Sequence, residues 1–577
     1  MPRLKLRLKP AFRIKKKPGK LTTEIEVKMP EFGERPPYLE EYIVKIKKET
    51  GEEPLLVDKP TGDMKKWKFF SVIYPIGGGV FIHAYMPREG TESGYAKYIV
   101  IEPPRPPSNL FRLIEVALAA KIQPYHVAES AEEKKKLLLL LLDDVIEIVD
   151  QPVNYEELEI KNTTVPVYKD DVDYVKYHLI RDKIGVGILE PFLRDPYIED
   201  ISCRGVGSIY IVHKIFGAME SNLGFKNEAE LDEFIIKLGE KIGKPITHAR
   251  PVVDATLPDG SRINIVYGKD VSLHGSNFTI RRVAKIPISV TQLIKWGTFN
   301  EYIAAYIWMM LSEGMSVFIC GETASGKTTS LNAISAFIRP NYKIVTIEDT
   351  AEVVLPHPNW VRELTRDTGK PESSVTMFDL LRAALRQRPN YIIVGEIRGA
   401  EGNIAFQAMQ TGHPVMATFH AANLERLIQR LTNPPISVPK TNMDSLNIAW
   451  FQSAVYSKTG LLVRRVITIN EIVGYDPESD AISAIPVFTW DPATDQFRFA
   501  GRGSSYLLEE KIAVMRGISR RDIKLIYEEL DLRAKYLRLL VERNIVDYFK
   551  VFKAIVKAYQ LGIEEAYKKL LRGDLML

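Results

Sequence analysis

The sequence predicts an α/β protein with a mixed α/β N-terminal region, a mostly parallel sheet with flanking helices, and a helical C-terminal extension. From about residue 291 to residue 476, strand-like and helix-like segments alternate, as a parallel sheet requires. Within that stretch, residues 316–320 read as a short buried strand, and residues 327–338 read as a helix that follows it. From Ser505 onward the pattern is helical, and Ser519 is a candidate cap for a helix over residues 520–542.

Between that strand and that helix lies a loop of the form Gly-x-x-x-x-Gly-Lys-Thr. Its backbone N–H groups can surround the phosphates of a nucleotide, and the helix N-terminus adds partial positive charge there. In such loops the lysine, here Lys327, reaches the β- and γ-phosphates, and the threonine, here Thr328, ligates magnesium. A chance match in a Gly-rich turn is the alternative, but the flanking strand and helix argue against it. The residues expected at the nucleotide are Gly321, Glu322, Thr323, Ala324, Ser325, Gly326, Lys327, Thr328 and Thr329.

The chain has 577 residues, which is too long for one hydrophobic core, so several domains are expected. We expect a basic arm and linker over residues 1–60 and an accessory α/β region over residues 61–160. An N-terminal α/β domain over residues 161–288 and the sheet domain with its C-terminal helices over residues 289–577 complete the chain.

The elements before the sheet domain follow from local patterns. Residues 69–74 and 79–85 look like strands separated by glycine turns, and helices dominate residues 109–149 and 173–188. A mixed stretch follows to about residue 282. Its strands are expected at residues 208–213 and 262–267.

Cysteine content and hydropathy exclude several classes. Only Cys203 and Cys320 are present, which excludes a four-cysteine zinc site, makes a disulfide framework implausible and favours a reducing compartment. The longest aliphatic run, residues 137–142, is far shorter than the roughly 20 residues of a membrane span, so we expect a buried helix there. No signal-peptide pattern is visible, and we expect a cytoplasmic protein that acts at the inner face of the membrane.

The net charge of +5 is unevenly distributed. Residues 1–28 hold ten Lys and Arg against Glu24 and Glu26, a balance of +8, so the remaining chain is about −3. Such an arm could lie on anionic lipid or nucleic acid. A solvated tail is the equal alternative.

Carboxylates follow two of the predicted strands. Residues 343–347 form an apolar strand that leads into Glu348 and Asp349, with Glu352 shortly after, and residues 391–394 lead into Gly395 and Glu396. In an open α/β sheet, ligands bind at the carboxyl ends of the strands, so both acidic sets should face the phosphate site. Capping of the following helices is the alternative role for these acids.

One further strand end and a set of arginines are also candidates. His420 lies at the end of a strand over residues 415–419, where it could sense the γ-phosphate; His413 is a weaker candidate, and no third ligand nearby supports zinc. Upstream arginines could close over a bound nucleotide, although each alone could equally be a surface or salt-bridging residue. They are Arg250, Arg262, Arg281 and Arg282.

Four boxes together resemble the secretion ATPase superfamily that powers type II and type IV secretion and type IV pili. They are the phosphate loop 321–328, an Asp box 347–352, a Walker B box 385–398 and a His box 411–420. The match favours the archaeal branch, which includes the archaellum motor ATPase (FlaI) and pilus assembly ATPases of the GspE/PilB type. Segments 195–201 and 257–262 resemble signatures of the family's N-terminal domain, and segments 433–439 and 471–475 resemble the archaeal members. The resemblance covers about residues 170–560. Many bacterial members carry a four-cysteine zinc subdomain, which this chain lacks.

The resemblance implies a RecA-like P-loop ATPase domain, a homo-hexamer, and ATP with Mg²⁺ bound between two domains. By position, Lys327 and Thr328 handle phosphate and magnesium, and Glu352 supports the magnesium. Glu396 orients or activates water, with Glu348 a second candidate. The same mapping assigns charge neutralisation to some of Arg250, Arg262, Arg281 and Arg282.

The function expected from this resemblance is ATP hydrolysis that drives assembly or rotation of a pilus-like filament or a secretion system through an integral membrane platform protein. A conjugation-type DNA-transfer motor shares the boxes, but no basic groove with interleaved aromatic residues supports direct contact with nucleic acid. A nucleotide-gated scaffold without turnover is the third reading. It would need neither Glu348, Glu396 nor His420.

Overall fold

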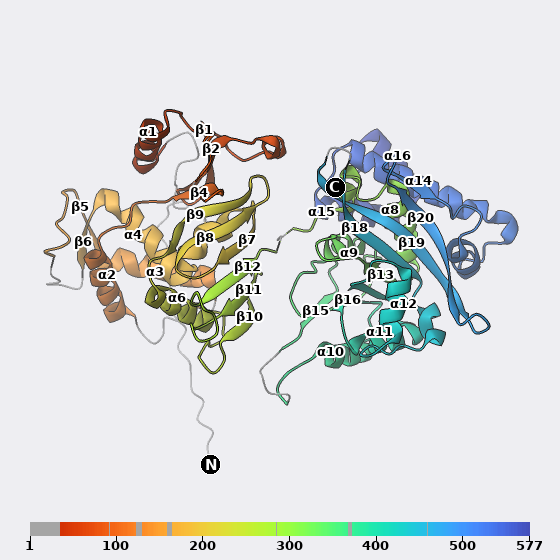
Figure 1. Ribbon diagram of the computed structural model, residues 1–577. Helices are drawn as coiled ribbons and strands as arrows, with labels where there is room; N and C mark the ends of the chain where they lie inside the picture. The colour runs from red at the N-terminus through yellow and green to blue at the C-terminus, as the bar shows by residue number, and fades with distance from the viewer. Residues whose placement is uncertain are drawn as a thin grey trace, which may run out of the picture. The chain divides into compact units, whose positions relative to one another are not determined.

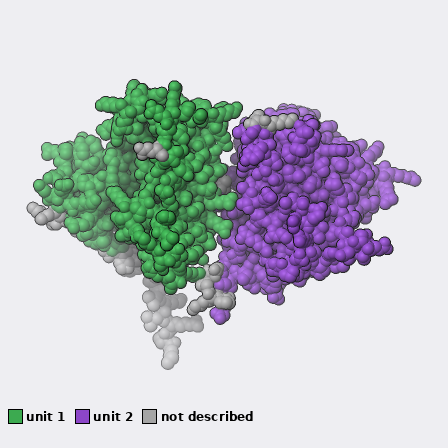
Figure 2. All heavy atoms as spheres, in the orientation of Figure 1, with its two compact units in different colours: residues 1–282 green, residues 283–577 purple. Residues whose placement is uncertain are grey.

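The computed structural model describes residues 35–91, 93–122, 128, 130–158, 164–283, 286–366, 372–457 and 460–576. The chain divides into two compact units, Met1–Arg282 and Val283–Leu577 (Figures 1 and 2). The basic arm over residues 1–28 lies outside the described residues. The finer divisions at residues 60, 160 and 288 stay predictions.

Unit 1 is built on a ten-stranded sheet in the order β1-β2-β3-β4-β9-β8-β7-β12-β11-β10. Side chains alternate between its two faces, and α6 (Glu228–Lys241) packs its buried Leu231, Ile235 and Leu238 into the same core as Phe278 and Ile280. The strands are β1 (Leu55–Leu56), β2 (Phe70–Gly77), β3 (Val80–Met86), β4 (Ala96–Ile101), β7 (Ile198–Cys203), β8 (Gly207–His213), β9 (Gly217–Phe225), β10 (Val252–Thr256), β11 (Arg262–Val266) and β12 (Asn277–Arg281).

A buried carboxylate ties the accessory strands to the rest of this sheet. The Oδ2 atom of Asp195 accepts hydrogen bonds from the hydroxyls of Tyr74 in β2 and Tyr98 in β4, at 2.7 and 2.8 Å. Its Oδ1 atom accepts one from the backbone N–H of Tyr197 at 2.8 Å. Burial raises the pKa of Asp195, although these hydrogen bonds oppose the rise. The carboxyl is therefore satisfied by donors from three separate segments.

The predicted linker before residue 60 contains a helix, α1 (Pro37–Thr50), which buries Leu39 and Ile43. Weak periodicity hid this helix, although Pro37 at its first position and Gly51 in a left-handed cap (φ 74°) mark its ends. This segment is therefore structured from Pro37 onward.

The stretch 109–149, in which helices are predicted, contains two helices and a strand. They are α2 (Ser108–Lys121), α3 (Ala131–Val145) and β5 (Ile146–Val149), which pairs in parallel with β6 (Val165–Tyr168). The aliphatic run lies in α3, where Leu141 and Leu142 are buried but Leu140 is 66% exposed. Within the described part of the chain, we find no helix with the length and apolar character that crossing a membrane demands. The helices α4 (Val172–Leu179) and α5 (Glu190–Arg194) complete unit 1.

Unit 2 is built on a nine-stranded sheet in the order β15-β14-β16-β17-β13-β18-β19-β20-β21. The strands from β15 to β18 run parallel, and the last three add antiparallel hairpins. The strands are β13 (Val317–Cys320), β14 (Ile344–Glu348), β15 (Trp360–Leu364), β16 (Tyr391–Ile397), β17 (Val415–Phe419), β18 (Ile448–Tyr456), β19 (Leu462–Asp476), β20 (Ala481–Asp491) and β21 (Gln496–Phe499).

Two hydrophobic cores cover the two faces of this sheet. One face packs against α8 and α9 with the C-terminal helices, and the other packs against α10, α11 and α12 (Figure 1). The phosphate loop leads from β13, inside the parallel part, to α9. This arrangement confirms the predicted RecA-like α/β fold. The helices are α7 (Val290–Lys295), α8 (Glu301–Ser312), α9 (Lys327–Ser335), α10 (Met377–Ala384), α11 (Glu401–Gln410) and α12 (Leu424–Thr432).

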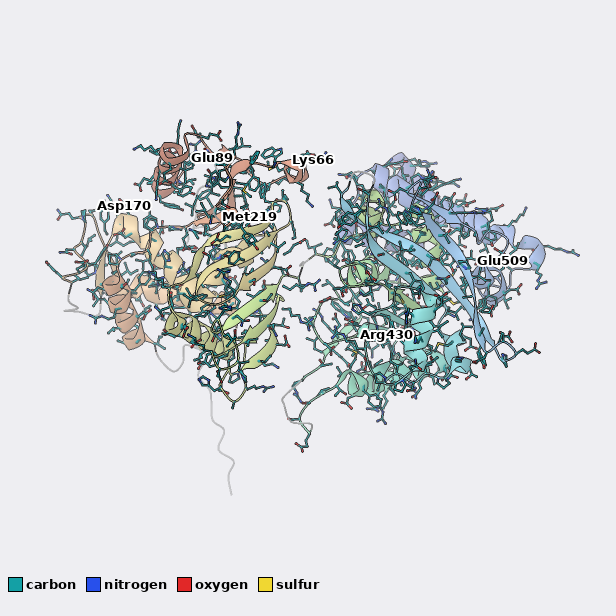
Figure 3. The ribbon with its side chains drawn as sticks, in the orientation of Figure 1. Lys66, Glu89, Asp170, Met219, Arg430 and Glu509 are labelled. Carbon is teal, nitrogen blue, oxygen red and sulfur yellow. The ribbon has the colours of Figure 1, made fainter. Side chains whose placement is uncertain are left out.

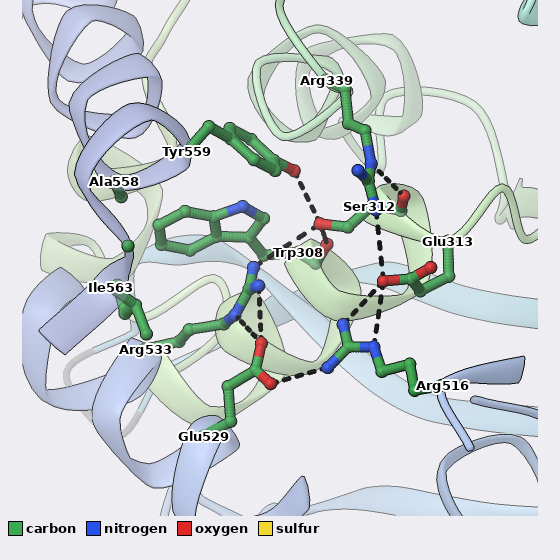
Figure 4. Close-up of a pocket in the computed structure, with 11 residues that line it drawn as sticks. Trp308, Ser312, Glu313, Arg339, Arg516, Glu529, Arg533, Ala558, Tyr559 and Ile563 are labelled. Atoms are coloured by element: carbon green, nitrogen blue, oxygen red, sulfur yellow. Dashed lines mark hydrogen bonds and ion pairs between the residues drawn. The ribbon is translucent and has the colours of Figure 1, made fainter. Parts of the chain in front are cut away.

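The C-terminal helices are fastened to the core by a charged network around a cavity of about 330 Å³ (Figure 4). Arg516 joins Glu313, after α8, to Glu529 of α14, and Arg533 holds the same Glu529 at 2.7 Å. Arg339, in the loop after α9, donates to the carbonyl of Ser312 at 2.7 Å. The helices are α13 (Ala513–Met515), α14 (Lys524–Glu542), α15 (Tyr548–Leu561) and α16 (Ile563–Arg572).

The start of α14 differs from the predicted helix over residues 520–542. A 3-10 turn, Arg520–Asp522, precedes it. The hydroxyl of Ser519 donates to the Asp522 carboxylate at 2.7 Å and does not accept a backbone N–H as a cap would.

Candidate functional site

The phosphate loop keeps its shape because of its glycines and one buried glutamine. Ala324 (φ 62°) and Gly326 (φ 90°) adopt left-handed backbone conformations. A Cβ atom on Gly326 would lie 2.9 Å from the Nε2 atom of Gln452, and one on Gly321 would lie 2.2 Å from the Gln452 carbonyl oxygen. The loop therefore passes too close to β18 for a side chain at either glycine.

Gln452 itself fixes the loop. Its Nε2 atom donates to the Ser325 carbonyl at 2.7 Å, and its Oε1 atom accepts from the Ser330 hydroxyl, in α9, at 2.7 Å. Sequence reasoning missed this residue. The available signal was a polar side chain inside the apolar strand Ile448–Tyr456, and its partners depend on the parallel pairing of β13 with β18.

Lys327 lies across the loop at the start of α9. Its Nζ atom donates to the carbonyls of Gly321 and Glu322 at 3.0 and 2.9 Å, and the residue is 8% exposed. Burial lowers its pKa, and the charge of Glu396 opposes that shift. Thr328 and Thr329 follow in the first turn and are half-buried, whereas Glu322 and Thr323 are exposed.

Glu396, in β16, lies between two basic side chains. Its Oε2 atom is 2.6 Å from a terminal nitrogen of Arg398, and its Oε1 atom is 2.9 Å from the Nε2 atom of His420, just after β17. Burial raises its pKa, but the hydrogen bond and charge of Arg398, with the charges of His420 and Lys327, reverse this, and the net pKa is lowered. The carboxylate is therefore ionised at neutral pH and can accept a proton or orient water.

Glu348 is almost completely buried at the end of β14. Its Oε1 atom accepts the backbone N–H groups of Glu352 and Val353 at 2.8 and 2.7 Å, so it shapes the loop that follows. Its Oε2 atom lies 3.5 Å from the Nε atom of Arg362 and has no hydrogen-bond partner among the described residues. Burial raises the pKa of Glu348 from 4.5 to about 7, although the two backbone N–H groups and Arg362 oppose the rise.

A clamp from α9 holds the same loop. The side chain of Asn332 donates to the carbonyl of Glu352 at 3.0 Å and accepts the N–H of Val354 at 2.9 Å. The loop that carries Glu352 is thus attached to the helix that carries Thr328. The negative charges of Glu352 and Asp349 also raise the pKa of Arg398, so both carboxylates lie near the Arg398 guanidinium.

The described residues contain no group of three or more His, Cys, Asp or Glu side chains that could hold a metal ion by themselves. At a nucleotide site, Mg²⁺ takes one or two protein oxygens and completes its shell with phosphates and water. The Thr328 hydroxyl and the Glu352 carboxylate are hard oxygen donors of the required kind.

The remaining predicted residues divide into those near the cluster and those apart from it. His420 joins Glu396, whereas His413 lies in the turn after α11, 3.3 Å from the Thr411 hydroxyl. Arg398 was missed as a candidate, although its position two residues after Glu396 at a strand end was an available signal.

The four candidate arginines belong to unit 1 and differ in their surroundings. Arg262 of β11 and Arg281 of β12 are direct cross-strand partners, so their side chains share one face of the sheet. Arg282 donates to the carbonyls of Phe192 and Asp195 at 2.7 and 3.1 Å, and its pKa is lowered by burial. Arg250 is exposed and forms an isolated antiparallel bridge with Thr247.

Comparisons with known proteins identify the family of this chain. The profile of the family described as "Type II/IV secretion system protein" matches residues 182–449. The type IV secretion system protein PtlH of Bordetella pertussis is 31% identical over 258 residues, which cover 40% of this chain and 72% of PtlH. This chain belongs to the type II/IV secretion system protein family.

Other relatives of this secretion system protein span more of its length. The uncharacterized protein MJ0900 of Methanocaldococcus jannaschii is 47% identical over 552 residues, which cover 93% of this chain and 98% of MJ0900. Among solved structures, the ATPase DotB of Legionella pneumophila is 20% identical and aligns over 59% of this chain and 94% of DotB, with a TM-score of 0.38.

Proposed function

We propose that this secretion system protein is an ATP hydrolase that drives assembly or rotation of an archaeal type IV pilus-like filament or secretion system. It works in the cytoplasm at the inner face of the membrane, as a homo-hexamer on an integral membrane platform protein. The observation that carries the proposal is the ionised Glu396, held between Arg398 and His420 and close enough to Lys327 for each charge to shift the pKa of the other.

The residues of this cluster divide the work of hydrolysis. Lys327 leaves the two loop carbonyls for the β- and γ-phosphates, and Glu396 accepts a proton from the attacking water or orients it. Thr328 and Glu352 hold magnesium, which neutralises charge on the phosphates when bound. Glu348 serves chiefly to shape the loop before Glu352, and it is the second candidate for the base.

The arginine pair on unit 1 supports a role at the γ-phosphate. Arg281 is the direct cross-strand partner of Arg262 in β11 and of Asp200 in β7, so the Asp200 carboxylate offsets part of the repulsion between the two arginines, and the γ-phosphate would offset more of it. Arg282 is committed to carbonyls of its own unit and is the weaker candidate for a finger. A scaffold that binds ATP without turnover would need neither the pair Arg262 and Arg281 nor the Glu396 cluster.

A steady-state ATPase assay tests the enzymatic part. We expect Lys327→Ala and Glu396→Gln to lose at least about 100-fold in kcat, because each removes a group that acts in the transition state. Glu425→Gln, at an exposed position in α12, is the matched control and should keep wild-type turnover. Wild-type rates in both site variants would overturn the assignment.

An experiment in the source cells identifies the filament or secretion system that the enzyme drives. Electron microscopy of source cells whose only copy carries Glu396→Gln should show the loss of one filament type. Intact filaments together with a defect in DNA transfer would instead favour the conjugation-type motor.

A further inference from the structure

A second basic pocket lies beside the Glu396 cluster in unit 2. Its volume is about 320 Å³. It is formed by the residue that follows β16, the second half of α12 and the segment after that helix. Its lining consists of Arg398, Gln429, Arg430, Asn433, Pro434, Pro435 and Ile436. Arg430 is labelled in Figure 3.

Both arginines of the pocket contact the catalytic candidates. Arg398 holds the Glu396 carboxylate at 2.6 Å, and Arg430 donates one N–H to the backbone carbonyl of His420. The Arg430 guanidinium also lies over the ring of Phe419, 5.1 Å from its centroid. The pocket is thus separated from the hydrolytic carboxylate by one guanidinium group.

The chemistry of the lining favours an anion. Two guanidinium groups and two amide side chains line the pocket, and none of its described lining residues carries a carboxylate. The side chain of Arg398 donates only to Glu396, and that of Arg430 only to His420, among the partners that the structure describes. An arginine has five N–H donors in a fixed fork suited to phosphate, so several donors remain for a ligand.

We propose that this pocket binds inorganic phosphate and receives the phosphate that hydrolysis produces, an inference that rests on the proposed function for the source of the ion. In the reaction, the water oxygen bonds to the γ-phosphorus and the bond from that phosphorus to the bridging oxygen breaks. ADP takes the electron pair, and Glu396 receives the proton of the water. The freed phosphate then meets Arg398, the neighbour of Glu396, and next Arg430.

The test measures phosphate binding while the phosphate loop is filled. The full-length protein is saturated with Mg²⁺ and AMP-PNP, and inorganic phosphate is titrated by calorimetry. Wild type should bind one phosphate per chain, and Arg430→Gln should weaken that binding by about tenfold or more, the loss expected for a charge-assisted bond. Arg521→Gln is the matched control, because it removes the same charge from an exposed position that does not line the pocket.

A second arm identifies the source of the ion. Phosphate release in a single turnover, followed with a phosphate-binding fluorescent reporter, should change in Arg430→Gln relative to Arg521→Gln, while the KM for ATP stays unchanged. Binding in the titration without any change in release would instead mean a site for phosphate from solution.

Failure of the pocket proposal and failure of the proposed function give different results. No phosphate binding by the AMP-PNP-loaded wild type, or equally weakened binding in both variants, would overturn the proposal that this pocket binds phosphate. Absence of ATP turnover in wild type would overturn the proposed function, while the titration would still decide whether the pocket binds phosphate.

Discussion

Replacement of Glu348 by glutamine should change how stability depends on pH. The folded protein raises the pKa of Glu348 from 4.5 to about 7, so the folded state binds more protons than the unfolded state between these values. Stability contributed by this carboxyl is therefore full below pH 4.5 and is lost as the pH rises to 7. The shift corresponds to a cost of about 3 kcal/mol above pH 7.

The Glu348→Gln variant removes this cost. Its amide oxygen can still accept the N–H groups of Glu352 and Val353, and the side chain no longer ionises. We expect similar stability of variant and wild type at pH 4.5. At pH 8 the variant should be more stable by up to about 3 kcal/mol, measured by chemical denaturation without nucleotide. Glu425→Gln, exposed in α12, serves as the control.

The difference in the free energy of unfolding between variant and wild type isolates the effect of Glu348 from that of all other titrating groups. A constant difference across pH 4.5–8 would refute the reasoning, because it would mean that Glu348 does not titrate in this range. A variant that is less stable at pH 8 would show that the ionised carboxylate is needed by Arg362.

Three further predictions address the loop, the arginines and the arm. Gln452→Leu should weaken ADP binding by about tenfold or more and lower the melting temperature, because it leaves the Ser325 carbonyl and the Ser330 hydroxyl without their partner; unchanged affinity would contradict the role of Gln452. Arg282→Leu should destabilise unit 1 by about 1–3 kcal/mol through its lost carbonyl contacts, whereas Arg281→Leu should lower kcat by about 10³-fold and leave stability unchanged. The reverse pattern would exchange their roles. Deletion of residues 1–28, which carry a balance of +8, should abolish co-sedimentation with anionic liposomes but not alter the behaviour with neutral ones.

Local signals were sufficient wherever structure and chemistry follow from adjacent residues. The strand, glycine loop and helix around Lys327 could be predicted because all three are continuous in sequence. Glu348 and Glu396 could be assigned to strand ends because an apolar run precedes each of them in the sequence. The rule that ligands bind where parallel strands end then made both of them site candidates.

Pairings across the sheet could not be predicted in the same way. Gln452 contacts the phosphate loop only because β18 pairs with β13, and Arg430 reaches His420 only because α12 turns back over β17. Neither contact has a local pattern. The helix α1 was missed for another reason, since its four buried residues are spread among ten polar or weakly apolar ones.

The parallel pairing of β4 with β9 bears on how this protein can be shortened. A truncated chain that starts at residue 161 would leave β9 as a bare edge strand, open to pairing with another molecule. It would also strip the buried Asp195 of the Tyr74 and Tyr98 hydroxyls. Expression trials that begin at residue 161 should therefore yield aggregates, whereas trials that begin just before Pro37 should yield monodisperse protein.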